Sequence, residues 1–144
     1  MRTFMKSIGV LASIALSGEA IACGVCVEDR VAATYDHALV RRAAAEHRLM
    51  VFVALDGADA SRVGDRIVST AARLETVQRG SIRYAGSPAA FSFVLARNAT
   101  PESVVAAFRK ATAGMQVSMK IVRLVRDGRL VEPAAIHADA GRAM

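Results

Sequence analysis

The stretch "LMVFVALDG" at residues 49–57 decides how the rest of the chain can fold. Its first seven residues are apolar and rich in branched side chains, and Asp56 and Gly57 then end the run. A short apolar run that is bounded by turn residues predicts a strand at the centre of a sheet. Neither face of this strand carries a charge, so both faces need a covering layer.

The sequence after this strand alternates between helix and strand patterns. Residues 58–74 have apolar side chains at helical spacing, and Thr100 and Pro101 form a typical start for a second helix that runs to residue 113. Three further strands are predicted at residues 76–85, 89–96 and 116–125, with a turn at 86–88 between the first two. The predicted order from residue 49 is therefore β-α-β-β-α-β.

This order resembles the ferredoxin-like fold, an α+β arrangement in which two helices cover one face of a four-stranded antiparallel sheet. The resemblance covers residues 49–130 and implies that the strands at 49–55 and 89–96 are central. The other two strands carry several arginines and a lysine, which suits edge positions because charged edges discourage edge-to-edge pairing. A likeness of architecture alone says little about function.

Residues 27–48 predict an additional N-terminal helix. Glu28 and Asp29 stand at its start and basic residues at its end, which suits the helix dipole. We expect this helix to lie on the second face of the sheet, opposite the other two helices. The alternative cover for that face is another subunit of a homo-oligomer.

Residues 1–22 have the pattern of a secretory signal peptide. A basic start leads into an apolar segment at residues 8–16, and Ala20 and Ala22 fit the small-x-small pattern before a cleavage site. The apolar segment is too short to span a bilayer. We therefore expect a periplasmic or secreted protein whose mature chain begins at Cys23.

The mature chain is predicted to form one domain over residues 23–131, followed by a flexible Ala-rich tail at 132–144. Lipidation of Cys23 is an alternative to a free amino terminus. Glu19 places a charge where a lipobox is apolar, so we expect ordinary cleavage without acyl groups.

The formal net charge of the chain is +6, and its arginines are scattered rather than clustered. Scattered basic residues in an exported protein indicate a solvated surface and not a nucleic-acid interface. The sequence contains no nucleophile elbow and no glycine-rich phosphate loop. We therefore assign no catalytic residue, and the sequence leans against an enzyme.

Cys23 and Cys26 are the two cysteines of the chain, and three interpretations of their Cys-x-x-Cys spacing stay open. Two thiolates can bind one soft ion such as copper or zinc, with the α-amine of Cys23 as a further donor. The pair can instead serve thiol–disulfide exchange or redox sensing, although no strand precedes it as in thioredoxin-like proteins. The third interpretation is a structural or partner-binding module in which a Cys23–Cys26 disulfide is incidental.

A metal site at this pair would need donors from elsewhere in the chain or from a periplasmic partner protein. By chemistry the candidates are His37, Met115 and Met119. Methionines are more often core residues, and helix histidines are more often surface residues. His37 and His47 both fall in the predicted first helix, and His137 is a weaker candidate still because it falls in the predicted tail.

Among ferredoxin-like domains, the heavy-metal-associated family is distantly similar to this chain. Its Cys-x-x-Cys lies in the loop after the first strand. In this chain that loop is "DGADAS" at residues 56–61, which contains no cysteine or histidine, so the family's ligands do not carry over. We interpret Asp56 and Asp59 as turn and cap groups. Any metal site must therefore rest on Cys23 and Cys26.

Overall fold

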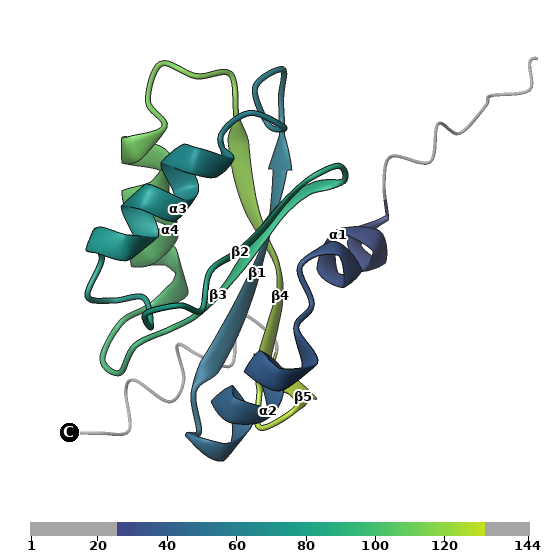
Figure 1. Cartoon of the computed structure of the whole chain (residues 1–144), viewed down its shortest axis with the longest axis vertical. Helices are drawn as coiled ribbons and strands as arrows, with labels where there is room; N and C mark the ends of the chain where they lie inside the picture. Colours follow the sequence, from purple (N-terminus) through teal and green to yellow (C-terminus); the bar gives the residue numbers. More distant parts are fainter. Residues whose placement is uncertain (1–25, 132–144) are drawn as a thin grey trace, which may run out of the picture.

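The computed structural model describes residues 26–131 of the chain. Within them it contains four helices and five strands (Figure 1). In chain order these are α1 (Val27–Ala33), α2 (His37–Ala45), β1 (Leu49–Asp56), α3 (Gly64–Arg73), β2 (Arg83–Gly86), β3 (Ala89–Val94), α4 (Pro101–Ala111), β4 (Ser118–Arg126) and β5 (Arg129–Leu130).

The strands form one sheet in the order β2-β3-β1-β4-β5, and each neighbouring pair is antiparallel. The α+β class is confirmed, and β1 lies at the centre as expected. The sheet has five strands instead of the expected four. Asp127 and Gly128 both adopt positive φ, at 53° and 73°, and such a turn folds the chain back as the short strand β5 beside β4.

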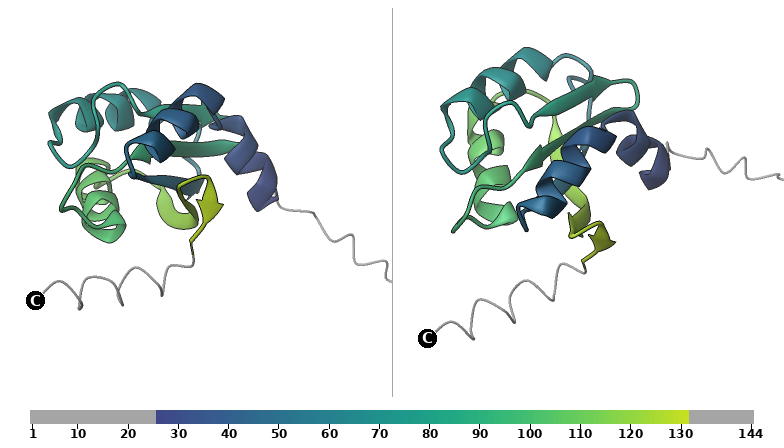
Figure 2. Two further views of the ribbon diagram at one scale, coloured as in Figure 1. Left: turned by 90° about the horizontal axis from the view of Figure 1, so that it is seen from below. Right: turned by 60° about the horizontal axis from the view of Figure 1, so that its bottom comes forward.

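The first hydrophobic core lies between the sheet and the helices α3 and α4, which pack side by side on one face (Figures 1 and 2). The odd-numbered residues of β1 point into it, together with Ile67 of α3 and Phe108 of α4. Phe91 and Phe93 of β3 meet Phe108 with ring centroids 4.9 and 5.8 Å away. This face follows the two-helix arrangement that the sequence predicts.

The second hydrophobic core lies on the opposite face, under α1 and α2. Met50 and Phe52 of β1 pack there against Leu39 and Val40 of α2 and Val31 of α1. Every residue from Leu49 to Leu55 is at most 3% exposed, so the prediction that this strand is buried on both faces is confirmed. The N-terminal helices, not another subunit, provide the cover on the second face.

A β-bulge in β4 shapes the face beneath α1. Phe52 pairs with Arg123 while the next residue, Val53, pairs with Ile121, so Val122 is extra in the ladder. Val122 packs against the second core and Arg123 bonds to Glu28 of α1, so both side chains lie on the face of the sheet that α1 and α2 cover. Ile121 and Leu124, on either side of the bulge, belong to the first core.

The expected single helix at residues 27–48 is wrong, because the structure has two helices with a break between them. Asp36 causes the break: it is extended, and its Oδ1 accepts a hydrogen bond from the Leu39 amide at 3.0 Å, which caps the start of α2. Its Oδ2 accepts hydrogen bonds from Nε and Nη2 of Arg83 in β2, at 3.0 and 2.8 Å. One carboxylate thus begins a helix and ties it to the edge of the sheet.

Asp36 is expected to make the protein less stable at acid pH. The Leu39 amide and then the Arg83 guanidinium lower the pKa of Asp36. The stability that ionised Asp36 contributes is therefore fully present above the ordinary aspartate pKa of about 3.9. It is lost as the pH falls through the lowered pKa that Asp36 has in the folded protein. Asp36→Asn should melt at a lower temperature near neutral pH, and its melting temperature should fall less than that of the wild type between about pH 6 and about pH 3.

Thermal unfolding followed by circular dichroism measures both effects. Glu75→Gln is the control, since Glu75 is exposed and forms no ion pair within residues 26–131. Equal acid sensitivity in Asp36→Asn and the wild type would rule out this role for Asp36.

The expected strand at residues 76–85 is also largely wrong, because β2 spans only Arg83–Gly86. Val77 forms an isolated bridge with Leu95, and the chain then turns away at Gly80, where φ is 72°. The buried Ser81 hydroxyl donates to the Gln78 carbonyl at 2.6 Å and accepts from the Val94 amide at 3.0 Å. A side chain thereby satisfies a backbone group that a strand would otherwise pair.

Candidate functional site

Cys26 is the first residue that the structure describes, and it is the N-cap residue of α1. Its backbone carbonyl accepts hydrogen bonds from the amides of Asp29 and Arg30, at 3.1 and 3.2 Å. Its side chain is exposed and takes no part in capping the helix. Cys23 lies outside the described residues. The described part of the candidate site is thus a thiol that is open to solvent at the start of a helix.

Two ion pairs fix α1 to the sheet. Glu28 receives both terminal nitrogens of Arg123 from β4, the residue that the β-bulge turns toward this face. Arg30 donates from Nη2 to Asp56 Oδ1 at 2.6 Å and from Nη1 to the Leu55 carbonyl at 3.1 Å, at the end of β1. Both contacts lie close to Cys26 in the sequence, so they fix its backbone relative to the sheet.

The other end of α1 is fixed by a buried hydrogen bond. The Ser92 hydroxyl of β3 donates to the Thr34 carbonyl at 2.9 Å, and both residues are at most 3% exposed. Val31, between the two ends, is part of the second core. The helix that follows the cysteine pair is therefore anchored to three strands.

Carboxylates determine the charge beside Cys26. Hydrogen bonding from Arg123 lowers the pKa of Glu28, and this arginine compensates its charge. Asp29 has no side-chain hydrogen bond or ion pair within residues 26–131. It lies one turn after Cys26 and is free to interact with a cation.

The other donors that the sequence offered do not gather around Cys26. Met119 is buried in the first core and Met115 packs against it, on the face of the sheet opposite α1. His37 contacts the ring of Tyr35, and His47 is hydrogen bonded to Asp127 at 2.9 Å. His137 lies outside the described residues. Within residues 26–131, no three histidine, cysteine or acidic residues form a group that could hold a metal ion.

The loop after β1 has the structural role that the sequence suggests. Asp56 binds Arg30, and Asp59 accepts a hydrogen bond from the Gln116 amide at 2.8 Å. That hydrogen bond, and then a contact with Arg62, lower the pKa of Asp59. Because these contacts hold the loop, α3 starts only at Gly64 and not at residue 58 as expected.

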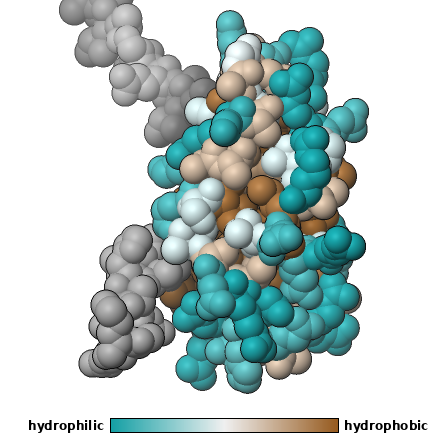
Figure 3. Space-filling view, turned by 90° about the vertical axis from the view of Figure 1, so that its left-hand side faces the viewer, coloured by the Kyte–Doolittle hydropathy of each residue, from teal (hydrophilic) through white to brown (hydrophobic). Residues whose placement is uncertain are grey.

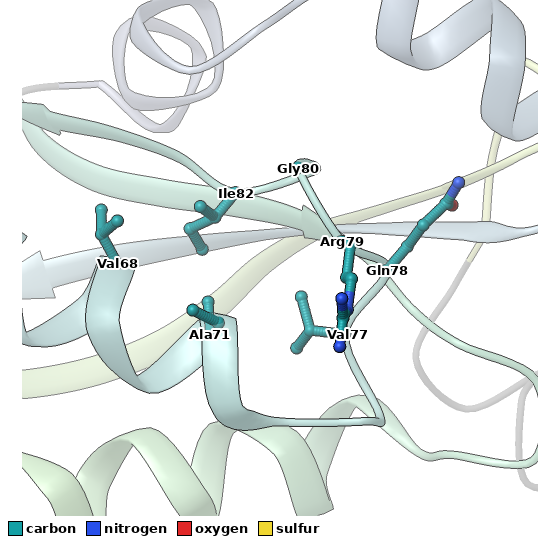
Figure 4. Close-up of a pocket in the computed structure, with 8 residues that line it drawn as sticks. Val68, Ala71, Val77, Gln78, Arg79, Gly80 and Ile82 are labelled. Atoms are coloured by element: carbon teal, nitrogen blue, oxygen red, sulfur yellow. The ribbon is translucent and has the colours of Figure 1, made fainter.

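Sequence reasoning missed one feature, a hollow of about 450 Å³ beside α3. It is lined by Val68, Ala71 and Ala72 of α3 and by residues of the segment 77–82 (Figure 4). A continuous strand at 76–85 would leave no such space. Gly80 was the available signal, because a glycine inside a strand pattern indicates a bulge or a turn.

None of the helices in the described part of the chain is long and apolar enough to span a membrane. Comparison with protein families, curated proteins and solved structures found no match to this chain.

Proposed function

We propose that this is an exported protein, periplasmic or secreted, that binds one soft metal ion through the thiolates of Cys23 and Cys26. Copper and zinc are the ions that suit two cysteines at this spacing. The observation that carries the proposal is the placement of Cys26, which is exposed at the start of a helix anchored to three strands. An anchored ligand loses less conformational freedom when it binds than one on a loose terminus.

The donor set can be built from four neighbouring residues and the helix that follows. Cys23 supplies a thiolate and, after cleavage behind Ala22, an α-amine, while Cys26 supplies the second thiolate. Asp29 places an unpaired carboxylate one turn further on, a ligand that zinc accepts and that attracts any cation. A partner protein can complete the coordination, as in transfer of a metal between two proteins.

Thiol–disulfide exchange is the second candidate, because the same anchored helix would also hold a redox pair. Two carboxylates occupy the first turn of α1: Arg123 compensates the charge of Glu28, and Asp29 has no ion pair within residues 26–131. Negative charge there stabilises a bound cation and opposes a free thiolate. This difference in charge is the reason to place metal binding first.

We also propose that the domain is ferredoxin-like, with β5 and the layer of α1 and α2 added to it. The support is the strand order β2-β3-β1-β4 together with α3 and α4 on one face. Any relation to the heavy-metal-associated family is then one of architecture, with the metal residues in a different place.

Cys26→Ser is expected to weaken metal binding by the reduced mature protein at least about tenfold, or about 1.4 kcal/mol. The variant keeps only the thiolate and the α-amine of Cys23, so two thiolates no longer hold the ion together. Binding should also weaken as the pH falls, since protons compete for both thiolates and the amine. Competition against a chromogenic chelator, with Cu(I) or Zn(II), measures both effects.

Val27→Ala is the control, since Val27 is exposed beside Cys26 and offers no donor. Mass spectrometry of the same sample verifies the start at Cys23, the absence of acyl groups and one metal ion per chain. Equally weak binding by the wild type and Cys26→Ser would refute the metal site. Turnover of a dithiol substrate would then identify a redox pair, and its absence would identify an incidental disulfide.

A further inference from the structure

The hollow beside α3 is apolar and open to solvent. Its volume of about 450 Å³ is in the range of small-molecule pockets, about 300–1,000 Å³. Val68 and Ala71 of α3 form one wall and Val77 and Ile82 form the other (Figure 4). Val68 is 46% exposed, an unusual position for a large apolar side chain on an otherwise polar helix face. Figure 3 shows hydrophobic residues in the middle of the face that carries α3 and α4, with hydrophilic residues around them.

A second hollow of about 440 Å³ continues the first, because the two share Ala72, Val77, Gln78 and Arg79. The lining of the second hollow is about half polar and half apolar, and it adds Arg48, Arg73 and Glu75. The apolar hollow thus adjoins one that has charged residues in its lining. Arg79 lies where the two meet.

The charge of the second compartment is predominantly positive. Arg73 and Arg79 have no ion pair and no side-chain hydrogen bond within residues 26–131. Arg48 is bonded from Nε to Glu46 at 3.1 Å, and Glu75 is the one acidic residue in the lining. Unpaired guanidinium groups at a pocket mouth bind carboxylates and phosphates well, since their planar fork matches these anions.

We infer that this double hollow binds a single-chain amphipathic anion. The apolar chain lies between Val68 and Ile82, where it removes exposed apolar surface from water. The head group, a carboxylate or a phosphate, lies at Arg79 and Arg73. This site lies on the face of the sheet opposite α1, which begins after Cys26, so it does not depend on the proposed metal binding.

The test uses the full mature protein with dodecanoate and, separately, dodecyl phosphate, both below their micelle concentrations. Titration calorimetry gives the affinity, and amide chemical shifts locate the ligand. Both ligands are expected to bind, with chemical-shift changes concentrated in α3 and residues 77–82. The difference between their two affinities shows whether the site prefers a carboxylate or a phosphate. Arg79→Gln should weaken binding about fivefold, and Val68→Glu at least about tenfold, because it adds a repelling charge to the apolar wall.

Two matched controls lie on the opposite face of the sheet: Arg41→Gln on α2 and Val27→Glu on α1, both at exposed positions. They should leave the affinity unchanged. If Val68→Glu fails to fold, Arg79→Gln still tests the inference. This variant should fold, since Arg79 is exposed and its side chain forms no hydrogen bond or ion pair within residues 26–131. The inference is overturned by equal binding of the uncharged dodecyl maltoside, by shifts that centre elsewhere, or by binding to anionic vesicles with none to the monomeric ligands.

Discussion

Replacing Phe108 with alanine is expected to lower the free energy of unfolding by about 3–5 kcal/mol. Phe108 is fully buried on α4, where its ring meets Phe91 edge-on at 4.9 Å and Phe93 at 5.8 Å. Phe91 and Phe93 are held in β3, which pairs with β1 and β2 on its two sides. The sheet therefore cannot collapse into the space left by the ring, and the cavity term adds to the loss of buried apolar area.

Urea unfolding followed by circular dichroism measures this loss. The midpoint should fall, while the slope with denaturant should stay close to that of the wild type because the surface exposed on unfolding hardly changes. Lys110→Ala is the control on the same helix, since Lys110 is exposed and forms no ion pair within residues 26–131. A loss below about 1 kcal/mol for Phe108→Ala would mean that the first core adapts to the deletion.

The apolar run at residues 49–55 was sufficient to predict the centre of the fold. A strand without a charge on either face needs two covering layers, and the chain has enough helices to supply both. The structure places β1 at the centre of the sheet, with α3 and α4 on one face and α1 and α2 on the other. Hydrophobic patterning alone carries this information, because it depends on residues that are adjacent in the sequence.

Two expected elements were wrong for a common physical reason. Asp36 caps the start of a second helix after the first has ended at Ala33, and the Ser81 hydroxyl bonds to a backbone amide that a neighbouring strand would otherwise pair. Each side chain acts with a partner distant in the sequence, Arg83 for Asp36 and Val94 for Ser81. Local propensity carries no information about such partners, so tertiary hydrogen bonds override it.

The candidate site was predictable only in part. The Cys-x-x-Cys spacing and the acidic first turn of the following helix are visible in the sequence. The anchoring of α1 is not, because it depends on a β-bulge that turns Arg123 toward Glu28. The hollow at α3 was missed for a similar reason, since the turn at Gly80 interrupts the expected strand between the bridge at Val77 and the start of β2.

Phe52→Ala is also expected to lower the free energy of unfolding by about 3–5 kcal/mol, but it should loosen a different part of the molecule. Phe52 is 1% exposed and is the one aromatic residue among the buried members of the second core. Its ring stacks on Tyr35, at 6.2 Å, in the break between α1 and α2. The second core has far fewer buried residues than the first, so it loses a larger share of its contacts when this ring is removed.

Amide hydrogen exchange distinguishes the two phenylalanine variants. In Phe52→Ala, exchange should accelerate in α1 and α2 well before α3 and α4, because local opening follows the loss of buried contacts in one layer. In Phe108→Ala, exchange should accelerate on both faces, since the larger core holds the sheet itself. Phe52→Ala should also weaken metal binding when Cys26 is intact, because it frees the helix that holds this thiol. Uniform acceleration in Phe52→Ala, or metal binding as tight as in the wild type, would show that anchoring of α1 does not support the thiol pair.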